Sequence, residues 1–213
     1  AKKMSSFMEV EEAINNCIAI TEEAINTNNS SSPTPNMALT QSLINDEFNL
    51  KILYSAVKYI KGRIKDAIDC LNGLITKYSL KGTNCNFNAF LAFLYHEKGV
   101  SVQFTKHYEA AKVFKMLELG INLKKPKINL KVKNEYKRPT LPLEQCDNIW
   151  YNLVNFFNEY HFYEISEKLL EFIDENNKQT IKFLIEKAKI ALSEKKTDEV
   201  IPLCDKIIEM DPD

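Results

Sequence analysis

Few residues in this chain have the types and spacing that catalysis or metal binding requires. The three histidines, His96, His107 and His161, have no neighbouring histidines, cysteines or carboxylates at the spacing of a zinc site. Cys85, His96 and His107 follow one another at equal intervals, but spacing alone does not establish a Cys-His nucleophilic pair. The chain also lacks a Gly-rich phosphate loop and a G-x-S-x-G motif. We therefore predict no catalytic, cofactor-binding or metal-binding residues and a protein that is not an enzyme.

The strongest charge feature is a basic segment at residues 124–138, whose one acidic residue is Glu135 in a chain of net charge -1. An extended cationic segment can attract an acidic protein tail or nucleic acid. Tyr136 is its only aromatic residue, so base stacking is poorly supported and nucleic acid ranks below protein. The alternative is a solvated loop between repeats. The candidate partner-binding residues of this segment are Lys124, Lys125, Lys127, Lys131, Lys133, Lys137 and Arg138.

Composition favours a helical protein of the cytoplasm. Glycine is scarce, with 5 residues, and long stretches of Glu, Lys, Leu and Ile contain few helix breakers. The 5 cysteines are scattered and form no C-x-x-C pair, which fits a reducing compartment. No apolar run is long enough for a membrane span. We expect protein partners, no membrane association and no small-molecule substrate.

Apolar residues recur at helical spacing along most of the chain, interrupted by polar and proline-containing stretches. Residues 28–36 (NNSSSPTPN) read as a flexible loop, and residues 99–106 read as a long turn. The stretch 122–146 holds three prolines and an alternating apolar run that suggests extended chain. We predict a partial repeat or capping helix at 1–27, a flexible loop at 28–45, two degenerate helix-pair units at 46–121, an extended basic insertion at 122–146 and two clean units at 147–213.

The last two segments, 147–180 and 181–213, align with each other over their whole length. Their period of about 34 residues is typical of helix pairs stacked into a solenoid. Trp150 aligns with Leu184, and small residues recur where the two helices of a pair should cross closely. A larger side chain at that position should push the helices apart. The predicted structural residues are Ala67, Ala110, Trp150, Ser166, Ala188 and Val200.

These residues make the chain similar to the tetratricopeptide repeat (TPR) proteins. In that family a Trp or Leu opens the first helix of a unit, a small residue opens the second and a Pro ends it. The matching residues are Trp150, Leu153, Phe157, Tyr163, Ser166 and Leu170 in one unit and Ala188, Val200, Ile207 and Pro212 in the next. The resemblance implies an all-α, right-handed superhelix of antiparallel helix pairs whose concave groove binds proteins. It also suggests that both ends of the chain continue into further repeats.

We therefore hypothesise a non-catalytic scaffold for protein–protein interaction. Asn155, Lys182 and Lys189 are the candidate groove residues. Residues 130–170 also resemble ciliary TPR proteins, which implies the cilium or flagellum axoneme and axonemal or microtubule-associated partners with acidic segments. One alternative is a chaperone adaptor that binds an acidic carboxy-terminal peptide, although Glu186 stands where those adaptors carry a cation. Another is a component of a different TPR assembly such as intraflagellar transport.

Overall fold

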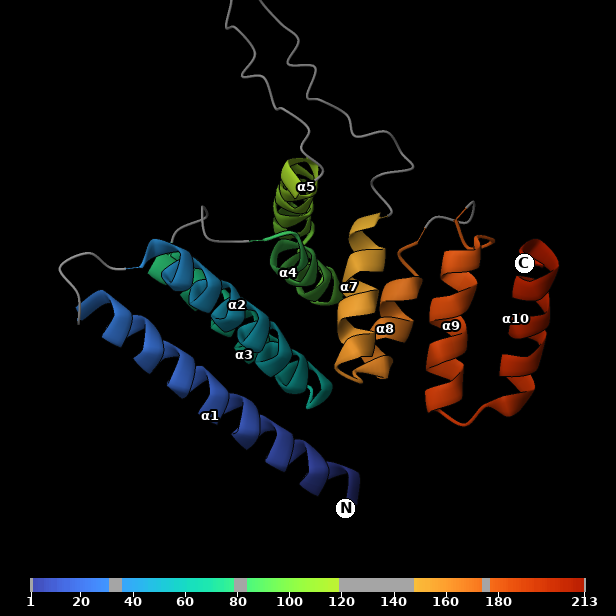
Figure 1. The fold of residues 1–213 in the computed structure, drawn as a ribbon, viewed down its shortest axis with the longest axis horizontal. Coiled ribbons are helices and arrows are strands. Elements are labelled where there is room, and N and C mark those ends of the chain that lie inside the picture. Colours follow the sequence, from blue (N-terminus) through green and yellow to red (C-terminus); the bar gives the residue numbers. More distant parts are fainter. Residues whose placement is uncertain (1, 31–35, 79–83, 119–147, 174–176, 213) are drawn as a thin grey trace, which may run out of the picture. The chain divides into compact units, whose positions relative to one another are not determined.

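The computed structural model describes residues 2–30, 36–78, 84–118, 148–173 and 177–212, which are helical or lie in short turns (Figure 1). No strand occurs among these residues. The predicted extended chain at 122–146 lies outside them. The helices are α1 Lys2–Ser30, α2 Met37–Ile60, α3 Ile64–Tyr78, α4 Cys85–Glu97, α5 Ser101–Glu118, α7 Asn148–Glu159, α8 Tyr163–Leu170, α9 Ile181–Ser193 and α10 Thr197–Met210.

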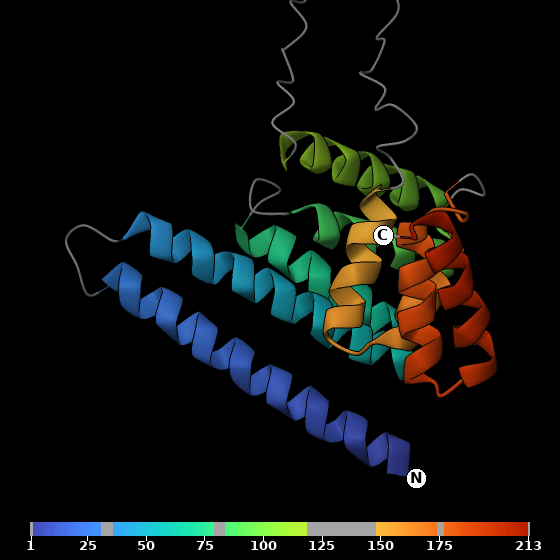
Figure 2. The same cartoon turned by 45° about the vertical axis from the view of Figure 1, so that its right-hand side comes forward.

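The chain divides into two compact units, residues 1–107 and residues 108–213, and α5 carries residues of both. In the first unit α1 packs on α2, α2 on α3, and both α2 and α3 on α4. Figures 1 and 2 both show α1, α2 and α3 side by side. Asparagine side chains fix the starts of two of these helices: Asn36 accepts a hydrogen bond from the backbone N–H of Leu39 (3.1 Å), and Asn84 accepts one from Phe87 (2.8 Å).

The core of the first unit is aromatic and centres on α4. Phe87, Phe90 and Phe93 are fully buried, and the ring of Phe48 from α2 meets Phe87 edge-on at 4.9 Å between centroids. Such pairs contribute about 0.5–1.5 kcal/mol beyond the area they bury. The run of apolar residues in α4 is therefore covered on nearly all sides, which explains why its sequence has little amphipathic character.

In the second unit α7 pairs with α8, α9 pairs with α10, and α9 contacts both α7 and α8. Trp150 holds the start of α7: its ring stacks on Tyr108 at 5.5 Å and lies 4.9 Å from Phe172. Phe157 and Ile165 fill the space between α7 and α8 and are fully buried. The apolar faces of these short helices supply most of their stability, because helices of this length are marginal alone.

The turns within four helix pairs have the same geometry. In each turn one residue has a positive φ and donates its N–H to the carbonyl three residues earlier, and the next residue donates to the carbonyl five residues earlier. The positive-φ residues are Gly62 (φ 75), Gly99 (φ 75), His161 (φ 62) and Lys195 (φ 61). His161 and Lys195 occupy equivalent positions in the two aligned segments, so the sequence period is also a period of the backbone.

The repeated turn also aligns the second helices. Five residues after each positive-φ residue, the second helix carries Ala67, Phe104, Ser166 and Val200 in turn. Ala67 and Ser166 are fully buried, whereas Val200 is half-buried. Small residues thus occupy this position in two pairs, and Phe104 replaces them in α5, where its ring contacts His96 at 5.6 Å.

The structure differs from several of the predictions about these elements. Residues 28–30 and 37–45, predicted to be loop, are helical, because α1 continues to Ser30 and Asn36 caps α2 after the proline-containing stretch. Residues 101–106, predicted to be turn, belong to α5. That error shifted the register, so Ala110 is not equivalent to Ala67 and is only half-buried, while the adjacent Ala111 is fully buried. Ala188 in α9 is also half-buried.

Candidate interaction surface

One group of predicted binding residues lies among the described residues of the second unit. Asn155 of α7 and Lys182 and Lys189 of α9 are exposed. The other group, the seven cations between Lys124 and Arg138, lies outside the described residues. We call the surface formed by the exposed side chains of α7 and α9 the α7–α9 face.

Tyr151 positions the first of the two lysines. The Lys182 ammonium lies over the Tyr151 ring, 4.9 Å from its centroid. The Tyr151 hydroxyl donates to the Asn177 backbone carbonyl at 3.0 Å and lies 3.1 Å from the Thr180 hydroxyl. Thr180 in turn caps α9 by accepting from the N–H of Phe183 at 3.3 Å. The start of α9 and the cation on it are therefore both tied to α7.

A buried polar pair joins the middle of the two helices. The side-chain amide of Asn158 in α7 donates to Glu186 in α9 at 2.6 Å, and both residues are almost fully buried. Lys189 donates to the other carboxylate oxygen of Glu186 at 2.8 Å from the exposed side. The carboxylate is thus satisfied by one neutral and one charged donor, as a buried charge requires.

Sequence reasoning treated Glu186 as a carboxylate that would face an incoming ligand, and it did not find Asn158. The structure instead places Glu186 between the helices. The sequence around Glu186 does not indicate that it is buried, because its buried partner, Asn158, is far away in the sequence. Asn155, which was predicted, donates to Glu159 at 3.1 Å on the surface of α7.

The exposed residues of α9 form a row of alternating charge and apolarity. Lys182, Ile185, Lys189 and Leu192 follow one another at helical spacing, and all four are exposed. Leucine and isoleucine in such a row leave apolar surface in water, flanked by two ammonium groups about two helical turns apart. A partner segment with both acidic and apolar side chains would satisfy both features of the row.

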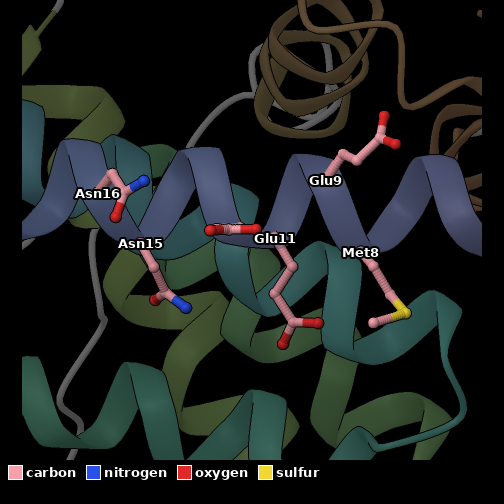
Figure 3. Close-up of a pocket in the computed structure, with 6 residues that line it drawn as sticks. Met8, Glu9, Glu11, Asn15 and Asn16 are labelled. Carbon is pink, nitrogen blue, oxygen red and sulfur yellow. The ribbon is translucent and has the colours of Figure 1, made fainter.

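A second group of polar and titratable side chains lies on α1, in the first unit. Met8, Glu9, Glu11, Glu12, Asn15 and Asn16 of α1 line a hollow of about 690 Å³ (Figure 3). Its Glu11 pairs with Lys58, Lys61 and Arg63 at the end of α2 and the following turn. The hydrogen bond from Lys61 is the main reason why the pKa of Glu11 lies below its usual value. This carboxylate therefore links helices rather than forming a vacant acidic site.

Neither metal-binding clusters nor disulfides occur in the described parts of the chain. No group of three or more His, Cys, Asp or Glu residues there could hold a metal ion, and the described cysteines are not in disulfide bonds. A hollow of about 280 Å³ in the second unit lies between α8, α9 and the start of α10. Its lining includes the apolar residues Phe183 and Ile190 together with several glutamates and lysines. None of the described helices has the length and apolarity needed to cross a bilayer.

Comparisons with known proteins gave distant structural matches only. No family model matches the chain, and no curated protein matches it. A tetratricopeptide repeat protein from Parabacteroides merdae is 13% identical, with 100% of this chain and 68% of that chain covered and a TM-score of 0.31. Kinesin light chain TPR-like repeats from Podosopora anserina are 9% identical, with 99% and 98% covered and a TM-score of 0.35.

These TM-scores are too low to assign a fold, so we assign it from the helices and turns of this chain. Its helix pairs repeat one turn geometry, and two of them do so in register with the repeat found in the sequence. The fold is all-α and TPR-like. The handedness of a superhelix over the whole chain stays a prediction.

Proposed function

We propose that the protein is a non-catalytic scaffold that binds an acidic, partly apolar segment of another protein on the α7–α9 face. The observation that carries this proposal is the exposed row Lys182, Ile185, Lys189 and Leu192. TPR-like helix pairs are binding scaffolds because they present such rows on rigid helices with few residues to reorganise.

The chemistry of the row sets the partner's chemistry. Lys182 is held over an aromatic ring and Lys189 beside a buried carboxylate, so both ammonium groups are pre-positioned. Lys189 forms an ion pair with Glu186, whose other carboxylate oxygen accepts from Asn158, so this ammonium group is fixed at the surface of α9. Ile185 then offers apolar surface between the two cations.

The chaperone-adaptor alternative needs a related but distinct ligand, a free terminal carboxylate. Because Glu186 is buried and its charge is balanced by Lys189, it should not repel such a ligand as its sequence position suggested. Comparing an acidic peptide that ends in a free carboxylate with the same peptide ending in an amide distinguishes the two. A partner that needs its internal acidic residues will bind both forms alike.

Two further parts of the hypothesis rest on sequence alone. The basic segment from Lys124 to Arg138 is proposed as a second contact for acidic partners. The resemblance of residues 130–170 to ciliary TPR proteins would place that partner in the axoneme, and the separate alternative is another TPR assembly such as intraflagellar transport. The comparisons support neither. The proposal for the α7–α9 face depends on neither of them.

The experiment is a titration of a fluorescent peptide containing glutamate and leucine, followed by anisotropy. Lys182→Glu together with Lys189→Glu should weaken binding at least about tenfold, because each reversal replaces attraction with repulsion. Lys65→Glu together with Lys206→Glu is the matched control, since both lysines are exposed on other helices. Equal binding by the two double variants would refute the proposed face.

The basic segment is tested separately with the same peptide. Reversing Lys131, Lys133 and Lys137 to glutamate should reduce binding most at low salt, where exposed charges are least screened. Circular dichroism spectra that match the wild type would show that the variant is folded, so that any loss of affinity reports on these charges. Unchanged affinity at low salt would remove this segment from the proposal.

A further inference from the structure

Helix α10 leaves much of its apolar surface uncovered. It packs on α9, yet none of its residues is buried. Val200, Leu203 and Ile207 are half-buried and share one face at helical spacing. We assign the packing of α10 on α9 to this face. The other apolar residues of the helix are exposed.

A second apolar row lies beside it. Ile201, Cys204 and Ile208 are spaced by three and four residues, which places them on one side of the helix. Ile201 is 58% exposed and Ile208 is 61% exposed, and Cys204 is a free, exposed thiol. The row extends over about two helical turns, or roughly 10 Å. Because these exposed side chains lie next to one another on one side of the helix, they form an apolar patch rather than isolated exposed residues.

One edge of this row is acidic. Asp198, Asp205 and Glu209 lie on the side of α10 next to Ile201 and Ile208 by helical spacing. Within the described residues none of these three carboxylates forms an ion pair, unlike Glu199 on another side of the helix, which is 4.0 Å from Lys196. Lys206 is the one basic residue that α10 contributes. The acidic edge therefore lacks compensating charge from its own helix.

We propose that Ile201, Cys204 and Ile208 with their acidic edge form a docking surface for a basic amphipathic helix of a partner protein. The apolar row matches the residues that such a helix presents at intervals of three and four, and its lysines or arginines would meet Asp198, Asp205 and Glu209. This surface selects the opposite charge from the α7–α9 face, so the second unit offers two binding faces for two kinds of segment.

The same charges argue against a second copy of this chain as the occupant. Two α10 helices packed through these rows would place carboxylates against carboxylates across the contact. Like charges in such a position oppose association. A helix rich in lysine and leucine gains both from apolar burial and from the attraction.

The experiment uses the full chain and a labelled synthetic helix of leucine and lysine with an apolar face, titrated by fluorescence anisotropy. The variant Ile201→Ser with Ile208→Ser should bind at least about tenfold more weakly. Ile20→Ser is the matched control, because Ile20 lies on α1 and is 67% exposed. Asp205→Lys with Glu209→Lys should weaken binding to a similar degree, whereas Glu23→Lys on α1 should leave it unchanged.

Each outcome decides the proposal. Binding that is lost in both α10 variants and retained in both α1 controls supports it. Equal binding of a helix with glutamate in place of lysine would overturn the role of the acidic edge. Failure of the basic helix to bind would overturn the surface as a whole. Dimerisation of the chain that Ile208→Ser abolishes, measured by sedimentation, would assign the row to a second copy instead. The Lys182→Glu, Lys189→Glu variant should bind the basic helix normally, so failure of this proposal is distinct from failure at the α7–α9 face.

Discussion

Asn158 and Glu186 form a buried hydrogen bond of 2.6 Å that joins α7 to α9, two helices that belong to successive repeats. The bond lies directly beneath the exposed row on α9, because Lys189 donates to the same carboxylate from outside. One carboxylate therefore contacts both the buried helix-to-helix bond and a lysine of the proposed binding row.

Replacing Glu186 with leucine should destabilise the second unit by about 1–3 kcal/mol, because the buried Asn158 amide would lose its acceptor. Glu186→Gln should cost less, since the Gln carbonyl can still accept from Asn158. The free energy of unfolding from urea titration provides the measurement. Glu209→Ala, at an exposed position of α10, should change it by no more than about 0.5 kcal/mol. An equal loss in the Leu and Gln variants would contradict the importance of this bond.

Ser166 tests how closely α7 and α8 cross. Its side chain is fully buried, and its hydroxyl donates to the Val154 carbonyl at 3.4 Å. Ser166→Leu should cost about 1–3 kcal/mol through overpacking, because the added atoms would separate the helices. Ser166→Ala should cost less, since it removes only a long hydrogen bond. Thermal unfolding of both variants followed by circular dichroism distinguishes the two effects, and full tolerance of leucine would contradict the close crossing.

The repeat period could be predicted from the sequence because it depends on local residues. The alignment of the last two segments anticipates the turns at His161 and Lys195, which have the same backbone hydrogen bonds. The starts of α2 and α5 could not be placed in the same way. Serine and proline near residue 30 suggested a long loop, but the single cap at Asn36 starts the helix soon after it.

The sequence also did not predict which charged residues are buried, for a physical reason. A glutamate reads as exposed unless a partner removes the cost of its desolvation. The partners of Glu47 and the buried partner of Glu186, Asn158, lie 28 to 31 residues away in sequence, so no local pattern indicates them. The exposed cations of α9 follow from helical spacing, but the ring beneath Lys182 does not.

His107 should make the stability of the first unit depend on pH. Burial, with a smaller effect from Lys106, lowers the pKa of His107 to about 4, and its ring stacks on Tyr95 with Nδ1 3.3 Å from the Asn88 amide oxygen. The unfolded chain takes up this proton near pH 6.5. Stability is therefore full above about pH 6.5 and falls as the pH drops toward 4, by up to about 3 kcal/mol.

The variant His107→Gln isolates this effect. Its stability should change less than that of the wild type between pH 6.5 and pH 4, because glutamine does not titrate. Urea unfolding at several pH values, compared with the exposed control His96→Gln, gives the difference directly. Parallel curves for the wild type and His107→Gln would show that the buried ring does not carry the proton linkage.

The last prediction concerns Glu47, a fully buried carboxylate of α2. Lys77 donates to it at 2.9 Å and the Tyr78 hydroxyl donates to it as well, so α3 supplies both partners. Lys77→Met should cost about 3 kcal/mol, because it leaves a buried charge without its counterion. Combining Lys77→Met with Glu47→Gln should recover part of that loss, since the unpaired charge is then absent.

Alkaline pH should have a related effect on this cluster. Burial alone would lower the pKa of Lys77, but its hydrogen bonds to Glu47 and Tyr78 raise it overall, and burial with the Glu47 hydrogen bond raises the pKa of Tyr78. Both groups then hold protons in the folded chain that the unfolded chain releases above about pH 10. Stability should thus decrease above that pH, and Glu47→Gln should flatten the decrease in urea unfolding. A variant as sensitive to alkali as the wild type would mean that Glu47 does not control these two protons.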